Sequence, residues 1–348
     1  MNDNPAFGAD LQPFMGIPSF MRLPVTRKLD GIDAAVMGVP FDSGVSYRSG
    51  TRFGPRKIRE ASLTLWGHNS TMKVTPTKAL KVVDYGDVSV IPTSIEHTMA
   101  AITGTAGEVL NAGATLITLG GDHSITLPLL RAHAKKYGAL SLVHVDAHLD
   151  TWEAEFASVP YSHGTPFRYA LQEGLIRKDE YMQIGIRGPV SNSHDYADAA
   201  ALGARTVTIH EVFKKGIELV LEEIHQRMKG PVYVSIDIDS ADPAYAPGTG
   251  TPEVGGLTSY QLLQLVRGLL GLDLVGSTWS KSRHPMTMAT LPPCWQPISF
   301  SNICLCSLSR GKHETEPARQ NYRSACGRAS CPRVGMGIAP AGRGAPAH

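Results

Sequence analysis

Alternating aspartates and histidines end a run of residues that is otherwise typical of a buried strand. The stretch SLVHVDAHLDTW, residues 141–152, begins with apolar residues and then places Asp146, His148 and Asp150 at every second position. Charged groups that are buried without partners destabilise a fold, whereas a bound cation compensates them. Imidazoles and carboxylates are common ligands of metal ions in proteins. The spacing therefore indicates a metal site.

Two further stretches of the same kind follow apolar runs. GGDHS, residues 120–124, comes after ATLITL, and DIDSADP, residues 237–243, comes after VYVSI. Residues two apart on an extended chain project to one face, roughly 6.5–7 Å from each other. If the three strand ends are neighbours, six candidate metal ligands converge: His123, Asp146, His148, Asp150, Asp237 and Asp239.

This ligand set favours Mn²⁺ or a similar ion, because it combines carboxylates and imidazoles without a thiolate. Its four aspartates carry more charge than one divalent ion neutralises, which favours a bridged pair of ions about 3.5–4 Å apart. Each cluster alone has a simpler explanation: His123 could cap a helix, a D-x-D pair often ends a solvated strand, and DAHLD could hold a single metal. His144, between two valines, is interpreted as a core histidine or one that positions a ligand.

These residues need a scaffold, and the chain alternates short apolar runs with helical periodicity. Strands are predicted over 34–40, 80–87, 114–120, 140–146, 182–187, 204–209, 231–239 and 272–276. Helices are predicted over 54–61, 96–112, 124–136, 194–202, 215–229 and 258–270. Most strands are apolar on both faces, as in a parallel sheet covered by helices on both sides. The alternation predicts one doubly wound α/β domain with a mostly parallel sheet of about eight strands, whose sites gather at the carboxyl ends of the strands.

The overall composition excludes some classes of protein. Of the 348 residues 42% are hydrophobic, which is enough for a large core. No apolar run reaches the roughly 18 residues that suggest a membrane span. The N-terminal stretch MNDNPAFGADLQPFMG lacks the apolar segment of a signal peptide, so a cytoplasmic location is expected. A net charge of +2 points to neither nucleic acid nor a membrane as a partner.

The composition changes abruptly between Gly276 and Ser277. Residues 277–348 hold nine Lys or Arg but only two acids, whereas the first 276 residues hold 24 basic and 29 acidic residues. All five cysteines also follow position 290. These changes divide the chain into an N-terminal arm (1–15), an α/β domain (16–276) and an aberrant tail (277–348). The tail is expected to be largely disordered, with 298–308 as its one candidate strand.

Three motifs in these clusters resemble the signatures of the ureohydrolase superfamily, which contains the arginases and agmatinases. They are GGDHS, DAHLD and SIDIDSADPAYAPGTGTPEVGG, and the similarity extends from about Gly16 to Gly276. GVPFDSGVSYRSGTRFGPRKIR and SHGTPFRYALQEGLI are more similar to the agmatinase branch. The resemblance implies an arginase-like fold and two Mn²⁺ ions per subunit, held by the six candidate ligands. Asp146 and Asp237 would bridge the two ions.

The resemblance also implies a reaction. Binding to divalent ions can lower the pKa of water from about 15.7 to about 7. The resulting bridging hydroxide would attack the guanidinium carbon and release urea and an amine. His163 in SHGTPF would donate a proton to the leaving amine. Asp122 and Asp242 would orient ligands or backbone, and Gly120 and Gly121 would let the backbone pass close to the metal.

The substrate stays open at this point. Agmatine, cleaved to putrescine and urea, is the first expectation, with guanidinobutyrate, guanidinopropionate and proclavaminate-type substrates as alternatives. The loops around 43–53 and 153–165 are expected to recognise the distal group of the small guanidino substrate. The resemblance further implies a homo-oligomer, a trimer or a hexamer. A non-catalytic metal-binding relative is the alternative from another class of protein.

One feature of the family is missing. In the family the strand after Gly276 continues as a stretch like DVVEVSPPYD, whose glutamate pairs with the substrate guanidinium through a bidentate contact. Here LDLVG is followed by STWSKSRHPMTMATLPPCW, which has no glutamate and no strand pattern. The chain as written is therefore expected to hydrolyse guanidines poorly or not at all.

The genetic code offers an explanation for the missing glutamate. A set of codons that encodes STWSKSRHPMTMATLPPCW reads DVVEVSPPYDHGDITALL when it is started two bases later, without a stop. We infer a one-base deletion near the codon for Ser277. The alternative is a genuine cysteine-containing segment that binds zinc or forms disulfides, but its spacing matches no standard zinc framework.

Overall fold

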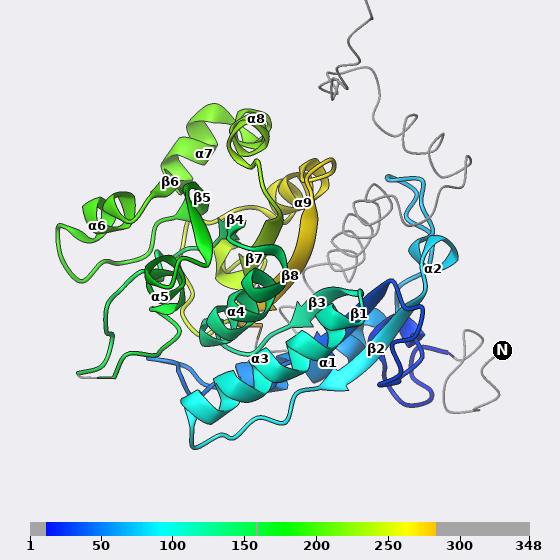
Figure 1. Ribbon diagram of the computed structural model, residues 1–348. Coiled ribbons are helices and arrows are strands. Elements are labelled where there is room, and N and C mark those ends of the chain that lie inside the picture. The colour runs from blue at the N-terminus through cyan, green and yellow to red at the C-terminus, as the bar shows by residue number, and fades with distance from the viewer. Residues whose placement is uncertain (1–11, 158, 283–348) are drawn as a thin grey trace, which may run out of the picture. The chain divides into compact units, whose positions relative to one another are not determined.

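Eight parallel strands form one sheet in the computed structural model, which describes residues 12–157 and 159–282 (Figure 1). They are β1 (Ala34–Gly38), β2 (Val82–Asp87), β3 (Thr115–Leu119), β4 (Leu140–Val145), β5 (Ile176–Ile186), β6 (Ala204–Thr208), β7 (Val232–Asp237) and β8 (Leu274–Ser280). The strand order is β2-β1-β3-β8-β7-β4-β5-β6. Every neighbouring pair is parallel. The predicted parallel α/β sheet is confirmed.

Helices cover both faces of this sheet. They are α1 (Gly54–Ser62), α2 (Pro76–Ala79), α3 (Ile95–Asn111), α4 (Thr126–Tyr137), α5 (Pro166–Gln172), α6 (Asp195–Ala201), α7 (Ile209–Lys215), α8 (Ile217–Arg227) and α9 (Ser259–Gly268), with four short 3-10 helices, η1 (Phe20–Arg22), η2 (Thr51–Phe53), η3 (His123–Ile125) and η4 (Ile238–Ser240). One hydrophobic cluster contains residues of α3, α4 and α5, and a second contains residues of α1, α7, α8 and α9.

Successive residues along a strand belong to different hydrophobic clusters. Val143 and Val145 of β4 belong to one cluster, whereas Leu142 belongs to the other. Because both faces of the sheet are covered, the strands are apolar along their whole length, which is why they could be predicted from sequence. Within the described part of the chain, every helix is too short or too polar to cross a membrane.

Two elements differ from their predicted bounds. The pattern over 215–229 predicts one helix, but α7 ends at Lys215 and α8 begins at Ile217. Gly216 between them adopts a φ of +85°, which glycine tolerates and which interrupts the helix. β5 begins at Ile176, well before the predicted start at residue 182. Other helices form close to their predicted bounds; α9, for example, begins with a capping box between Thr258 and Gln261.

The strand order brings the three polar clusters together. β3, β8, β7 and β4 are consecutive neighbours, and parallel strands present their carboxyl ends at the same edge of a sheet. GGDHS follows β3, DAHLD follows β4, and DIDSADP begins at the end of β7. β8 lies between β3 and β7, so the residue that follows β8 enters the middle of this group.

The expectation that no strand follows Gly276 is wrong, because β8 continues to Ser280. Ser277 is paired with Ile117 of β3 on one side and with Val234 of β7 on the other. A central strand with partners on both sides forms even where the sequence lacks a continuous apolar run. The candidate strand over 298–308, the rest of the tail from residue 283 and residues 1–11 of the arm lie outside the described residues.

Candidate metal centre

The six predicted ligands lie together at the carboxyl edge of the sheet. They extend from three strand ends: His123 in η3 after β3, Asp146, His148 and Asp150 in the segment after β4, and Asp237 and Asp239 at the end of β7 and in η4. Five of the six residues are at most 3% exposed, and His148 is largely buried. Four aspartates buried this deeply require cations beside them.

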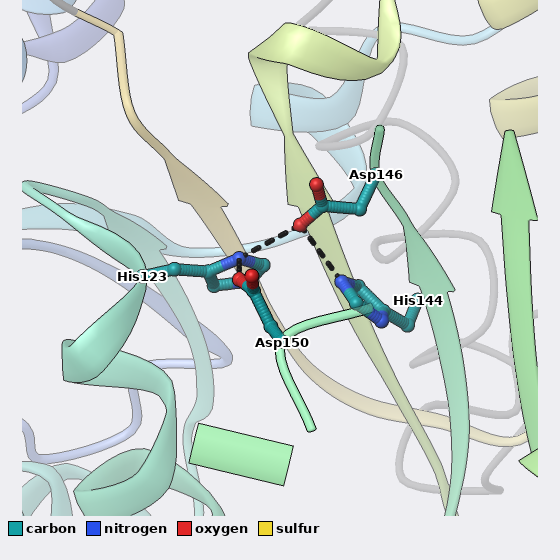
Figure 2. Close-up of side chains that lie close together, drawn as sticks. All are labelled: His123, His144, Asp146 and Asp150. Atoms are coloured by element: carbon teal, nitrogen blue, oxygen red, sulfur yellow. Dashed lines mark hydrogen bonds and ion pairs between the residues drawn. The ribbon is translucent and has the colours of Figure 1, made fainter. Parts of the chain in front are cut away.

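One group of side chains surrounds the Nδ1 atom of His123 (Figure 2). Nδ1 lies 2.9 Å from an oxygen of Asp146, 2.9 Å from one of Asp150 and 3.2 Å from one of Asp237. His144 approaches from β4, and its Nε2 lies 2.9 Å from the same Asp146 oxygen. The candidate ligand atoms of His123, His144, Asp146 and Asp150 lie within 4.8 Å of one another, which is close enough to share a metal ion.

The surroundings of His123 fit those of a metal ligand. Its Nε2 lies 2.8 Å from Ser235 Oγ, at hydrogen-bonding distance. Its Nδ1 is buried and forms no hydrogen bond among the described residues, although three carboxylates approach it. When Nε2–H donates to Ser235, Nδ1 presents a lone pair to these carboxylates, and a cation between them makes that arrangement favourable. These residues therefore fit a divalent metal ion.

A second group, formed by Asp146, His148 and Asp239, shares Asp146 with the first. His148 Nδ1 lies 3.3 Å from Asp146 Oδ1 and 3.2 Å from Asp239 Oδ2. The two oxygens of Asp146 thus face different groups, Oδ2 toward His123 and Oδ1 toward His148. A carboxylate placed in this way can bridge two ions, which supports the prediction for Asp146.

Lys281, the residue after β8, brings an ammonium group into this centre. The residue is 1% exposed, and its Nζ lies 3.0 Å from Asp237 Oδ2 and 3.2 Å from Asp239 Oδ2. The Nζ also lies 3.7 Å from Asp150 Oδ2. Lys281 belongs to the tail that the sequence assigns to no element, so it was not among the predicted site residues.

The carboxylates of the centre shift the pKa values of their neighbours. Burial lowers the pKa of His123, but the three carboxylates close to its Nδ1 outweigh burial and raise that pKa well above its usual value. Burial and the neighbouring charge of Asp239 raise the pKa of Asp237. Without metal, His123 and Asp237 thus favour their protonated forms, and binding a metal to them would release these protons.

His163, the predicted proton donor, is held beside the centre by a different set of residues. Its Nε2 lies 2.7 Å from Ser46 Oγ and 3.2 Å from Glu155 Oε1. Its backbone N–H donates to the Gly44 carbonyl, and the N–H of Gly44 donates to Asp122 Oδ2, each at 2.9 Å. His163 is therefore linked through the backbone to the GGDHS cluster, and its role as a donor stays a prediction.

The pair of Glu155 and His163 predicts a pH-dependent contribution to stability. Burial raises the pKa of Glu155, but hydrogen bonds from His163, Ser162 and Ser46 outweigh it and hold that pKa at about 2, below the ordinary 4.5. A depressed carboxylate pKa stabilises the fold above the unfolded-state value, and this stabilisation is lost as the pH falls toward 2. We expect Glu155→Gln to be less stable than the wild type at neutral pH.

Urea unfolding of both proteins between neutral pH and pH 2 measures this effect. The difference in the free energy of unfolding should shrink once the pH falls below 4.5 and vanish near 2. A difference that stays constant over this range would show that Glu155 is not held ionised by these contacts.

Asp122 and Asp242 hold backbone segments around the ligands, which supports their predicted orienting role. Asp122 is buried and accepts hydrogen bonds from the N–H groups of Gly44 and Ser124, each at 2.9 Å. Asp242 accepts from the two N–H groups of residues 255–256 at 2.7 and 3.1 Å. The hydrogen bond from the Ser124 N–H to Asp122 fixes the start of η3, where His123 lies.

Gly120 and Gly121 are required for close backbone packing. A Cβ atom on Gly121 would lie 1.7 Å from the carbonyl oxygen of Phe41, and one on Gly120 would lie 2.5 Å from that of Trp279. Both glycines thus allow a close approach of neighbouring backbone, and the predicted approach of this backbone to a metal stays a prediction. Trp279 belongs to β8, so Gly120 allows β8 to pack beside the end of β3.

Ser235 and Glu253 are two further residues of the centre that are missing from the predicted set. Ser235 contacts His123 Nε2, and it lies two residues before Asp237 on β7, so the period of two already placed it on the same face. Glu253 Oε1 lies 3.7 Å from His148 Nε2. Glu253 follows a loop without periodicity, so no spacing signal could have found it.

Comparisons with known proteins agree with this geometry. A sequence profile of the Arginase family matches residues 32–278. Guanidinobutyrase of Pseudomonas aeruginosa is 44% identical over 276 residues, which cover 78% of this chain and 86% of that protein. Mitochondrial agmatinase of Gallus gallus is 44% identical over 263 residues, which cover 75% of this chain and 77% of that protein.

A solved structure has a similar fold. The proclavaminate amidinohydrolase of Streptomyces clavuligerus matches with a TM-score of 0.79 at 37% identity, over 84% of this chain and 98% of that one. The profile match ends inside β8, just after the compositional break at Gly276. The match over most of the chain, the identity to these relatives and the shared fold together show that the chain belongs to the arginase family.

Proposed function

We propose that the centre, once the reading frame after Gly276 is restored, binds two Mn²⁺ ions and hydrolyses a linear guanidino compound to urea and an amine. The observation that carries this proposal is the buried pair of Asp/His groups that share Asp146, in a chain of the arginase family. Two divalent ions, when bound, supply the Lewis acidity that activates water at neutral pH. A guanidinium carbon is a poor electrophile because the group is resonance-stabilised, so it requires such activation.

The chain's own residues control the proton that the leaving amine needs. Ser46 and Glu155 both contact the Nε2 atom of His163, with Ser46 Oγ at 2.7 Å and Glu155 Oε1 at 3.2 Å, which leaves Nδ1 as the other ring nitrogen. That Nδ1 has no hydrogen-bond partner among the described residues, so it is the atom that can pass a proton to the amine.

A cavity that borders Glu155, the partner of His163, favours a substrate whose distal group is positively charged. The cavity has a volume of about 480 Å³ and borders Thr151, the residue after Asp150. Its charged lining residues are Glu153, Glu155, Asp195 and Asp198, with Arg168 as the basic one. Carboxylates that line a cavity attract a cation and repel another carboxylate. This favours agmatine, which ends in an ammonium group, over guanidinobutyrate, which ends in a carboxylate.

Urea release from agmatine and from guanidinobutyrate in the presence of Mn²⁺ tests the proposal. The assay uses the frame-restored protein, which is encoded after one base is added near the codon for Ser277. We expect kcat/KM for agmatine to be at least about tenfold higher, which corresponds to roughly 1.4 kcal/mol of transition-state stabilisation. A preference for guanidinobutyrate would contradict the assignment of agmatine. Absence of urea from every linear guanidine tried would contradict the hydrolase itself.

A metal-binding relative without hydrolase activity is the second candidate for the chain as written, and Lys281 favours it. In the alternate reading DVVE, the glutamate codon takes the last base of the Ser280 codon and the first two bases of the Lys281 codon. Once the missing base is restored, the glutamate stands at position 281. The chain as written thus has an ammonium group where a guanidinium needs a carboxylate. Urea assays of this chain with Mn²⁺ separate the two candidates.

A further inference from the structure

The position of Lys281 is a consequence of the sheet order. β8 lies between β3 and β7, whose ends carry His123 and Asp237, so the next residue after β8 lies between these two candidate ligands. The Lys281 backbone N–H donates to the Gly121 carbonyl at 2.7 Å, which fixes the start of its side chain. From there the side chain runs into the centre and is 1% exposed.

We propose that Lys281 is an internal cation that competes with divalent metal ions for this centre. The chain as written therefore binds Mn²⁺ weakly and takes up fewer than two ions. This inference rests on the proposed two-metal function of the same site, and it adds a residue that controls how much metal the site can hold.

The ammonium group and a metal ion require the same space. Carboxylate oxygens hold divalent ions at about 2.0–2.6 Å. Lys281 Nζ already lies 3.0 Å from Asp237 Oδ2 and 3.2 Å from Asp239 Oδ2, and these two aspartates are predicted ligands. An ion that binds both oxygens from the side that Nζ occupies would overlap with Nζ. Metal binding therefore requires the lysine side chain to move away.

Leaving the centre is unfavourable for the lysine. Its Nζ is surrounded by carboxylates of Asp150, Asp237 and Asp239. A buried ammonium that loses such partners is left uncompensated unless it reaches water. Lys281 also neutralises one of the four aspartate charges, which reduces the attraction of the centre for a second divalent ion. The overlap in space and the loss of negative charge thus both weaken the binding of Mn²⁺.

Calorimetric titration with Mn²⁺ tests this inference on the purified wild type and three purified variants. The metal content of each protein is measured by mass spectrometry. Lys281→Met removes the charge and keeps a side chain of similar length. Lys281→Arg keeps a cation. Lys215→Met removes a lysine that is paired with Glu211 at 2.6 Å and is 37% exposed, outside the centre. All four proteins are purified with Mn²⁺ present and then dialysed.

We expect Lys281→Met to bind Mn²⁺ at least about tenfold more tightly than the wild type and to hold about one more ion, because a buried cation that must be displaced weakens binding by at least that factor. Lys281→Arg and Lys215→Met should bind Mn²⁺ as the wild type does. In EDTA, Lys281→Met should have a lower melting temperature than the wild type, and Mn²⁺ should raise it by more.

Other outcomes separate this inference from the proposed function. If the wild type and Lys281→Met both hold two Mn²⁺ ions with equal affinity, Lys281 does not compete, and the two-metal centre stands. If none of the four proteins binds Mn²⁺, both the competition and the metal-dependent function are wrong. If Lys281→Met does not fold, two tightly bound ions in the wild type or in Lys281→Arg would still overturn the inference.

Discussion

Restoring the reading frame after Gly276 is expected to raise urea release by on the order of 1,000-fold. With the inferred base restored, the reading DVVE would place a glutamate at position 281, where the chain as written has an ammonium group between Asp237 and Asp239. A carboxylate there can form a bidentate contact with the substrate guanidinium, whereas an ammonium repels it. Breaking a buried charge pair costs roughly 3–5 kcal/mol, which corresponds to about 100- to 5,000-fold in rate.

A matched pair of substitutions in the chain as written isolates this residue from the rest of the tail. Lys281→Glu should recover part of the activity, while Lys281→Gln, which removes the ammonium without adding a carboxylate, should recover less. Steady-state urea assays with saturating Mn²⁺ measure both. If the frame-restored protein with bound Mn²⁺ stays inactive on every guanidine tried, the hydrolase assignment is wrong. Sequencing the source DNA across codons 273–285 shows whether the base is present.

Asp146→Asn is expected to lower the affinity for Mn²⁺ by more than about 100-fold. Even residues outside the ligand shell typically contribute roughly 10–100-fold to metal affinity, and Asp146 faces both groups of ligands. Asparagine keeps the shape of the side chain but has no charge and only one acceptor oxygen, so it cannot bridge two ions. Calorimetric titration of the frame-restored protein with and without this substitution measures the loss.

Asp84→Asn is the matched control, because it makes the same chemical change at another buried aspartate. Asp84 is 1% exposed and pairs with Arg59 at 2.7 Å, away from the metal centre. We expect it to lower the free energy of unfolding by roughly 3–5 kcal/mol, since it breaks a buried ion pair, and to leave the affinity for Mn²⁺ unchanged. Two ions bound to Asp146→Asn at the affinity of the parent protein would exclude a bridging role for Asp146.

Much of the scaffold could be predicted because its signals are local. Strands such as β4 and β7 are buried on both faces, so each appears as a short apolar run. The candidate ligands follow those runs at a spacing of two, which an extended chain converts into a shared face. Residue type and spacing therefore determined which side chains could bind metal and at which edge of the sheet they lie.

The tertiary structure decided which segments far apart in sequence meet. Ser277 and Thr278 have no strand pattern, yet they extend β8 because β3 and β7 pair with it on both sides. The same pairing places Lys281 among the aspartates. Likewise, Glu155 and Ser46 meet His163 through loops without any periodicity. Local patterns report which face of an element is buried, whereas neighbouring strands and loop paths depend on the packing of the whole sheet.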